Sequence, residues 1–257
     1  MRTVISLGGG VQSTLLALAC TEKYYDKKIA EKIGDPIIIM SDTGSEKPET
    51  MEYVNNIIVP ELKNSNIEHY IVTSQYGVLH EFYKEQNIIP YRRYRSCTDR
   101  FKITPINKKI KELGFNKKNP IKLVFGITVD EAQRMKPNTK KWIQNIYPLI
   151  DEGLSRDDCI AWYKKHDLPI PVKSGCFCCP FTTQKEWLKL NESHPELIQI
   201  SIDLEENASK FRERKISLFK DDVSLGDLIE GHQRQMPLEA FFEEFSSDDE
   251  CSANCFL

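Results

Sequence analysis

The 257-residue sequence has no long hydrophobic run. No segment approaches the ~18 consecutive apolar residues that a membrane-spanning helix needs, and no basic segment followed by an apolar run opens the chain. We therefore expect neither a membrane span nor a signal peptide, and we expect a cytoplasmic protein. The net charge is only −3, so the composition as a whole lacks the strongly basic balance typical of nucleic-acid-binding proteins.

Histidine is scarce, and the five histidines are scattered without the spacing of metal ligands. Cysteine is more frequent, with eight residues. In a cytosolic chain this number indicates metal or redox chemistry more than disulfides. Cys20 lies on an apolar helix face and is expected in the core.

The first fourteen residues predict a strand, a glycine turn and a helix. An apolar run at 3–7 is followed by Gly8, Gly9 and Gly10 and then by helix-forming residues from Val11. Three glycines leave no side chains over the turn. Free N–H groups and the helix N-terminus then favour an anion, most often a phosphate. The loop lacks the lysine of a Walker loop and the third glycine of a dinucleotide fingerprint. A purely structural turn is the alternative.

Further apolar runs alternate with helical patterns along the first half of the chain. Strand-like runs stand at 37–40, 67–73 and 121–127. This alternation predicts an α/β fold with a doubly wound, mostly parallel sheet. Ligands in such sheets bind at the carboxyl ends of the strands. We therefore expect the segments that follow three of the strands to converge on one crevice, at 8–10, 41–44 and 126–131.

The character of the sequence changes after residue 150. Ser155 and Asp158 are typical of a helix N-terminus, and a polar periodic stretch over 182–215 predicts helices with a break at Pro195. We predict three parts: a nucleotide-binding domain at 1–150, a helical cysteine-containing region at 151–240, and an acidic mobile tail at 241–257.

The most basic stretch runs from Lys84 to Lys122, with twelve Lys or Arg against three acids. Its central part, Arg92–Lys102, mixes arginine with tyrosine, which suits phosphates and stacked bases. A solvated helix face explains the lysines at 108–118 equally well. We predict phosphate contact at Arg92–Lys102, with tRNA or DNA as candidate partners.

The glycine loop resembles the pyrophosphate loop, or PP-loop, of the adenine-nucleotide α-hydrolase superfamily, which reads roughly Ser-Gly-Gly-x-Asp-Ser-Thr. Gly8 stands here in place of the usual Ser, and Gln12 in place of the usual Asp. Asp-Thr-Gly at 42–44 followed by Pro-Glu-Thr at 48–50 resembles the phosphoadenosine phosphosulfate (PAPS) reductase branch. Similar segments follow at 126–134 and 147–162. The chain is identified by resemblance, from Arg2 to about Leu190, as a member of the PAPS reductase family.

This resemblance implies that the chain binds ATP or a related adenine nucleotide with Mg²⁺. The implied nucleotide-binding residues are Ser6, Gly8, Gly9, Gly10, Ser13, Thr14, Asp42 and Gly126. The implied catalytic residues are Gln12, Ser13, Asp42 and Arg134. Arg134 would clamp phosphate through its guanidinium. Asp42 would hold a ribose hydroxyl or a Mg²⁺-bound water, or would only close an Asx turn.

The cysteines also match the iron–sulfur members of the family in part. Cys97, and Cys176 with Cys179 in a Cys-x-x-Cys pattern, stand where those members carry theirs. Ser96 replaces a first cysteine, and Phe101 is one residue extra. The resemblance implies a [4Fe–4S] cluster on Cys97, Cys176 and Cys179, with Cys178 as a fourth ligand or with an open iron. Zinc on the same four cysteines and inert buried thiols are the alternatives.

Three functions are compatible with these observations. The first is an enzyme that cleaves ATP between the α- and β-phosphates and activates a substrate, expected to be a nucleic acid, for sulfur transfer from a sulfur-donor protein. The second is a PAPS or APS sulfonucleotide reductase, with Cys251 after Glu250 as nucleophile, although acidic neighbours raise a thiol pKa. The third is a non-catalytic nucleotide-sensing subunit, favoured by the departures at Gly8 and Gln12 and by Thr128, which stands where an arginine is common in the family.

Overall fold

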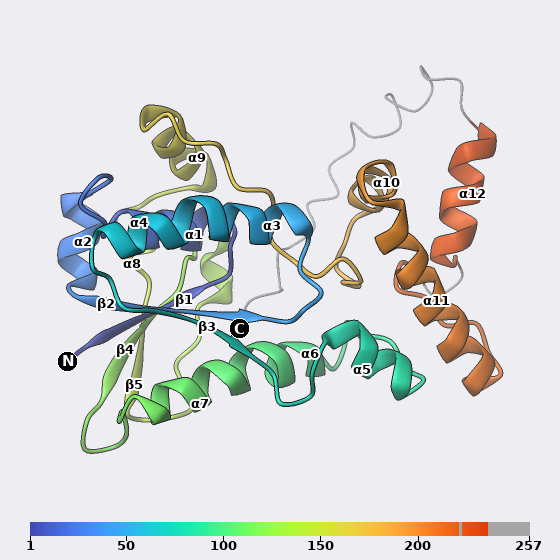
Figure 1. Cartoon of the computed structure of the whole chain (residues 1–257), viewed down its shortest axis with the longest axis horizontal. Coiled ribbons are helices and arrows are strands. Elements are labelled where there is room, and N and C mark those ends of the chain that lie inside the picture. The colour runs from blue at the N-terminus through green and yellow to red at the C-terminus, as the bar shows by residue number, and fades with distance from the viewer. Residues whose placement is uncertain (221–222, 236–257) are drawn as a thin grey trace.

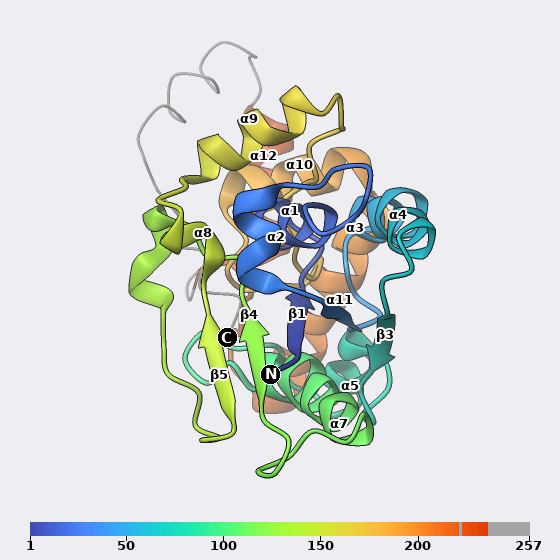
Figure 2. The same ribbon diagram turned by 90° about the vertical axis from the view of Figure 1, so that its left-hand side faces the viewer.

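A parallel five-stranded sheet forms the centre of the computed structural model, which describes residues 1–220 and 223–235. The strands are arranged in the order β3-β2-β1-β4-β5 (Figure 2). Their bounds are β1 Thr3–Leu7, β2 Pro36–Asp42, β3 His69–Thr73, β4 Ile121–Val124 and β5 Ile143–Ile146. Ile5 at the centre pairs with Ile38 on one side and Val124 on the other. The predicted α/β fold with a parallel sheet is confirmed.

Helices cover both faces of this sheet (Figure 1). One face carries α1 Val11–Leu18, α2 Lys27–Ile33, α3 Pro48–Tyr53, α4 Val59–Asn64, α8 Pro148–Asp151 and α9 Arg156–Lys165. The other face carries α7 Thr104–Glu112, which the short helices α5 Leu79–Glu85 and α6 Ser96–Thr98 precede. The C-terminal helices α10 Gln184–Ser193, α11 Pro195–Arg212 and α12 Leu225–Gln235 form a separate group beside the sheet.

The strand β2 shows how the two faces are built. Ile38 and Met40 pack into the apolar cluster beneath α1, and Ile37 and Ile39 pack into the cluster beneath α7. Successive side chains of a strand point to opposite faces, so a strand buried on both sides is apolar throughout. This explains why its sequence is a continuous run of isoleucines. Burial of each of these side chains contributes roughly 1.5–3 kcal/mol.

A third apolar cluster joins the C-terminal helices to α5 and to the start of α7. The indole of Trp187 and the ring of Phe101 are completely buried in it, together with Cys178. The predicted boundaries after residues 150 and 240 stay predictions. The predicted tail at 241–257, with Cys251 and Cys255, lies outside the described residues.

Two π-helical turns each end two residues before a proline. Val54–Ile58 precedes Pro60, and Asp99–Ile103 precedes Pro105. A proline inside a helix has no N–H to donate, and the wider turn shifts the hydrogen-bond pairing there. At Pro60 the chain therefore forms a widened turn and continues as the helix α4. Phe101, the residue extra to the family pattern, lies inside the second of these turns.

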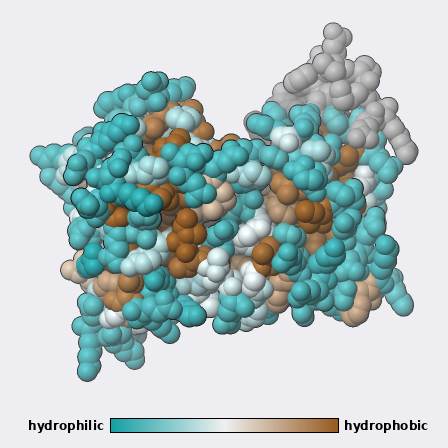
Figure 3. Space-filling model, in the orientation of Figure 1, coloured by the Kyte–Doolittle hydropathy of each residue, from teal (hydrophilic) through white to brown (hydrophobic). Residues whose placement is uncertain are grey.

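The starts of two helices were predicted, and one strand was not. Ser155 and Asp158 form a capping box at the start of α9, and Pro195 begins α11, both as predicted. Strand β5 was not predicted. None of the helices in the described ranges is long and apolar enough to cross a membrane. The face shown in Figure 3 is mostly hydrophilic, with hydrophobic residues in separate patches.

Candidate functional site: a cleft at the ends of β1 and β4

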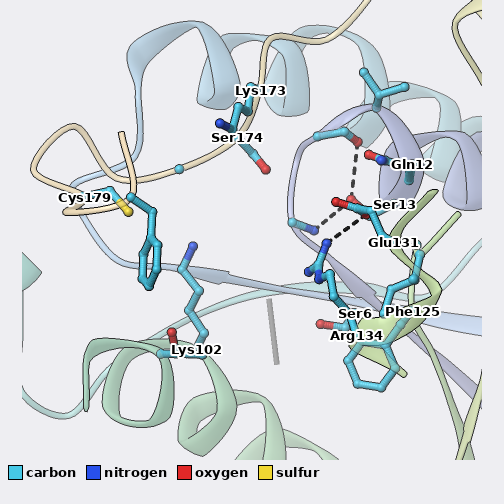
Figure 4. Close-up of a pocket in the computed structure, with 18 of the residues that line it drawn as sticks. Ser6, Gln12, Ser13, Lys102, Phe125, Glu131, Arg134, Lys173, Ser174 and Cys179 are labelled. Carbon is cyan, nitrogen blue, oxygen red and sulfur yellow. Dashed lines mark hydrogen bonds and ion pairs between the residues drawn. The ribbon is translucent and has the colours of Figure 1, made fainter. Parts of the chain in front are cut away.

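A cleft of about 460 Å³ opens at the carboxyl ends of β1 and β4. The chain proceeds from β1 toward β2 and β3 on one side and returns as β4 and β5 on the other. This switch point is where ligands bind in open α/β sheets. In Figure 4, Ser13 and Arg134 lie across the cleft from Lys102, Lys173 and Cys179.

The glycine loop between β1 and α1 forms one wall. Gly9 has a φ of +73°, which an L side chain adopts only with strain. A Cβ there would also stand 2.6 Å from the Thr50 Cγ2 atom, and a Cβ on Gly10 would stand 2.8 Å from the Ser174 hydroxyl. The loop therefore needs glycine for its conformation and for the closeness of its neighbours.

Ser13 holds this loop together from the first turn of α1. The Gly8 N–H donates to the Ser13 hydroxyl oxygen at 3.1 Å, and that hydroxyl donates to the Gly10 carbonyl at 3.4 Å (Figure 4). Ser6, Gly8, Gly10, Gln12 and Ser13 all line the cleft, in agreement with their predicted place.

Two other predicted residues of the loop do not line the cleft. Gly9 faces Thr50, and Thr14 is completely buried. The predicted hydroxyl contact of Thr14 with a phosphate is therefore not supported. Successive residues of a helix point in different directions. Ser13 points toward the cleft, so Thr14, the next residue of α1, points toward α9 and the core.

The segment after β4 approaches the loop closely. A Cβ on Gly126 would stand 2.5 Å from the Ser13 backbone nitrogen and 2.8 Å from the Gln12 carbonyl carbon. The neighbouring Phe125 side chain lines the cleft, and its ring stacks on Tyr147 with centroids 6.1 Å apart. Gly126 thus acts by leaving room for the backbone of α1.

Cationic side chains surround the cleft. Arg134 is buried and pairs with Glu131 at 2.8 Å, and Arg156 donates to the Gln12 side-chain oxygen at 3.3 Å. Five cations line the cleft against the three carboxylates of Asp130, Glu131 and Glu186, an excess of two; the cations are Lys47, Lys102, Arg134, Arg156 and Lys173. Such an excess favours a polyanionic ligand.

Sequence reasoning missed three of these cations: Lys47, Arg156 and Lys173. Lys47 lies within the segment 42–50 that resembles the family, so the resemblance could have indicated that this lysine is near the site. Nothing in the sequence around Arg156 or Lys173 indicates a place in the cleft, because it is the fold that brings α9 and the segment before Cys176 there.

Glu186 fixes one rim of the cleft. It closes a capping box with Thr183 at the start of α10 and pairs with Lys173 at 2.9 Å. Burial alone would raise the pKa of Glu186, but the Thr183 N–H and the Lys173 ammonium together lower it below its usual range. The carboxylate is therefore ionised at neutral pH and orients Lys173.

Asp42 does not reach the cleft. Its side chain accepts the Gly44 N–H at 2.7 Å and closes an Asx turn at the end of β2. This is the structural alternative to the predicted role. The turn uses one oxygen of this carboxylate, and the contact with ribose or Mg²⁺ stays a prediction.

The cysteines lie near one another without forming a metal site. Cys97, Cys176 and Cys178 belong to the same apolar cluster, and Cys176 and Cys179 line the cleft. In the described part of the chain, no three His, Cys, Asp or Glu side chains are arranged to hold a metal ion. As placed, the four cysteines do not fit a cluster or a zinc ion, and the metal set stays a prediction.

A buried polar network holds Cys176 instead. Its thiol lies 3.3 Å from the Thr43 hydroxyl and 3.8 Å from a Glu46 carboxylate oxygen. The same carboxylate pairs with Lys102 at 3.2 Å. Burial, and then the charge of Glu46, raise the pKa of Cys176 to about 12.

The basic segment Arg92–Lys102 is only partly available to a ligand. The Arg92 guanidinium donates to the carbonyls of Pro180 and Phe219. Arg95 lies over the Phe181 ring at 5.4 Å, and Arg100 lies over the rings of Tyr76 and Phe82. Three of its arginines therefore contact the rest of the fold, and phosphate contact at this segment stays a prediction.

The fold and the cleft together define an α/β protein with a cleft at its switch point that five cationic side chains line. The sequence matches no protein-family model. A curated relative, an uncharacterized protein of Methanocaldococcus jannaschii, is 24% identical over 227 residues. The match covers 77% of this chain and 46% of the relative, so the chain spans about half of that protein's length.

Two solved structures are similar in fold. One is PAPS reductase from Candida auris in a phosphate complex, with 15% identity and a TM-score of 0.47, covering 66% of this chain and 75% of that one. The other is the U34-tRNA thiolase NcsA from Methanococcus maripaludis with its [4Fe–4S] cluster. It is 16% identical with a TM-score of 0.41, over 91% of this chain and 71% of that one.

Proposed function

We propose that the chain is a PP-loop enzyme of the PAPS reductase family that binds ATP, or a related adenine nucleotide, with Mg²⁺ and cleaves it between the α- and β-phosphates. The observation that carries this proposal is the convergence of the glycine loop, the N-terminus of α1 and five cationic side chains on one cleft. Its volume of about 460 Å³ lies within the usual range of small-molecule sites.

In this proposal the two ends of the nucleotide meet different walls. Pyrophosphate lies against Gly8, Gly10 and the first turn of α1, where backbone N–H groups and the helix dipole favour an anion. Arg134 and Arg156 exchange their present partners, Glu131 and Gln12, for phosphate oxygens. The adenine occupies the apolar part, which is lined by Ile103, Ile106, Phe125 and Ile127.

The proposed chemistry is adenylation. An oxygen of the substrate attacks the α-phosphorus, the bond to the bridging oxygen breaks, and pyrophosphate leaves with Mg²⁺. The loop and the arginines stabilise the charge that develops on the leaving pyrophosphate. A sulfide-level sulfur supplied by a donor protein, as hydrosulfide or a thiocarboxylate, then attacks the substrate carbon that bears the adenylated oxygen; the C–O bond breaks, and AMP leaves with that oxygen. A nucleic acid is the proposed acceptor.

No step of this reaction is assigned to a metal cluster, since the cysteines as placed do not form a site. Elemental analysis of anaerobically purified protein tests the prediction separately. About four iron and four sulfide per chain would identify a [4Fe–4S] cluster, and about one zinc per chain would identify the structural alternative. Protein that holds neither metal would refute the predicted metal set.

Substitution of the cleft residues tests the nucleotide site. We expect Arg134→Gln and Ser13→Ala to weaken MgATP binding at least about tenfold, because each removes a charge-assisted or loop-forming contact. Lys63→Gln, an exposed lysine in α4, is the matched control and should bind as the native protein does. Native affinity in both cleft variants would overturn the proposal.

Two alternatives use the same cleft. A sulfonucleotide reductase would release sulfite from PAPS or APS, and Cys251→Ser would abolish that release. A nucleotide-sensing subunit would bind ATP tightly without turnover, with or without nucleic acid. No described contact favours either of them over adenylation, and the products of incubation with each nucleotide distinguish the three.

A further inference from the structure

The loop between α5 and α6 exposes two tyrosine rings beside the cleft. The exposed fractions of Tyr91 and Tyr94 are 48% and 76%. Their ring centroids lie 5.9 Å apart, with the planes tilted by 32°. Neither side chain has a hydrogen bond to another described residue. Two large rings that stay in water, side by side, constitute an exposed aromatic surface that needs an explanation.

Neighbouring arginines hold this loop in one conformation. Arg92 is tied to the carbonyls of Pro180 and Phe219, and Arg95 lies over Phe181. The backbone of Arg95 is left-handed, with a φ of +48°, a conformation that costs a non-glycine residue free energy and persists only when the surroundings impose it. The two tyrosines are therefore presented on a fixed support.

The loop also carries an available positive charge. Arg93 is exposed between the two tyrosines, and no described residue forms an ion pair with it. The surrounding stretch from Lys84 to Lys122 has nine more basic than acidic residues in a chain whose net charge is −3. An exposed ring pair beside an exposed guanidinium that no described residue pairs with matches the chemistry of bases and phosphates.

The position of the loop connects it to the cleft. Thr98, four residues after Tyr94, lines the cleft, and so does Phe181 beneath Arg95. Four residues of extended chain span at most about 14 Å, so Tyr94 lies within a few nucleotides of the cleft mouth. A strand stacked on the tyrosines would reach the cleft with its next bases.

We infer that Tyr91, Tyr94 and Arg93 form a stacking platform for a single-stranded segment of nucleic acid whose adjoining nucleotide enters the cleft. The rings stack on two bases, and Arg93 contacts the phosphate between or beside them. This inference rests on the proposed function only for what happens in the cleft; the platform itself is independent of nucleotide cleavage.

Fluorescence anisotropy with a labelled strand of about 15 nucleotides tests the platform, with RNA, DNA and the corresponding duplex as separate ligands. We expect Tyr94→Ala to weaken single-strand binding roughly 5- to 150-fold, the effect of losing one stacked base. Tyr94→Phe keeps the ring and should stay within about twofold of native. Tyr25→Ala removes another tyrosine, 57% exposed in a distant loop, and should leave affinity unchanged.

The salt dependence separates the roles of the residues. Arg93→Gln should reduce the slope of log affinity against log salt by about 0.7, the value for one phosphate contact to a single strand, whereas Tyr94→Ala should leave the slope unchanged. Stronger binding of the duplex than of the single strand, native affinity in Tyr94→Ala, or an equal loss in Tyr25→Ala would each overturn the inference.

Measurement of MgATP affinity in the same variants keeps the two proposals distinct. We expect Tyr94→Ala to bind MgATP as the native protein does. A native protein that binds the strand through Tyr94 but does not bind MgATP would support the platform and refute the proposed function. Dimerisation or capture of a protein lost in Tyr94→Ala, without any strand binding, would instead identify a protein-binding surface and refute the platform.

Discussion

Substitution of Gly126 by alanine tests the closest approach in the candidate site. The added Cβ would stand 2.5 Å from the Ser13 nitrogen and 2.8 Å from the Gln12 carbonyl carbon. Both are backbone atoms in the first turn of α1, so neither neighbour can rotate away. Since ordinary contact begins near 3.4 Å, the two segments must separate by about 0.9 Å along this line.

This displacement sets the expected losses of stability and of MgATP affinity. Overpacking of this kind costs about 1–3 kcal/mol, which lowers the midpoint of thermal unfolding by about 2–12 °C in a domain of this size. The donors that face the anion site must be held within about 0.5 Å. Loss of one charge-assisted hydrogen bond would weaken MgATP binding roughly 10- to 150-fold.

Thermal unfolding and calorimetric titration with MgATP measure the two effects. Gly175→Ala is the matched control, because Gly175 also lines the cleft but a Cβ there meets nothing within 4 Å. We expect this control to retain native stability and affinity. A Gly126→Ala protein that unfolds and binds MgATP as the native protein does would refute the close approach of β4 and the loop.

Three further substitutions test the surroundings of the site. Gly9→Ala should destabilise the protein by more than about 1 kcal/mol, because φ is positive and Thr50 is too close; adding Thr50→Ser, which removes the clashing methyl group, should restore part of the loss in thermal unfolding. Because the pKa of Glu186 is lowered in the folded protein, its contribution to the free energy of unfolding is full above the ordinary pKa of 4.5 and declines as the pH falls below that value. The free energy of unfolding of Glu186→Gln, measured with denaturant, should therefore vary less with pH in this range than that of the native protein. At pH 7 the two free energies should differ by less than about 1 kcal/mol. Equal pH dependence would show that the pairing with Lys173 stabilises nothing. Arg92→Ala should lower the free energy of unfolding by about 1.5–3 kcal/mol through its lost bonds to two carbonyls, and an unchanged value would contradict the structural role given to this arginine.

The sheet was largely predictable because its inner strands are buried on both faces. Such strands must be continuously apolar, and the run at Ile37–Met40 carries that signal in four residues. Strand β5 escaped prediction because it is an edge strand, with neighbours on one side only, and its middle residues Gln144 and Asn145 are polar. Its pairing with β4 is a tertiary contact that the local sequence does not encode.

In the candidate site, too, features set by neighbouring residues were predictable and features set by distant residues were not. The glycine loop was predictable because strand, turn and helix are adjacent in the chain. Arg92 was not, because its partners Pro180 and Phe219 lie 88 and 127 residues away. Local composition predicted a charge there but not whether that charge faces a ligand or the protein. For Asp42, the local turn and the distant ligand competed for one carboxylate, and the turn is what the structure shows.

Phosphorus NMR of the native protein incubated with MgATP and a mixture of single-stranded nucleic acids identifies which phosphate bond of ATP is cleaved. We expect AMP and pyrophosphate as the products, because the proposed role of the loop and the arginines is to hold the pyrophosphate that leaves. Formation of ADP and inorganic phosphate, or no interaction with MgATP at millimolar concentration, would contradict the proposed cleavage between the α- and β-phosphates.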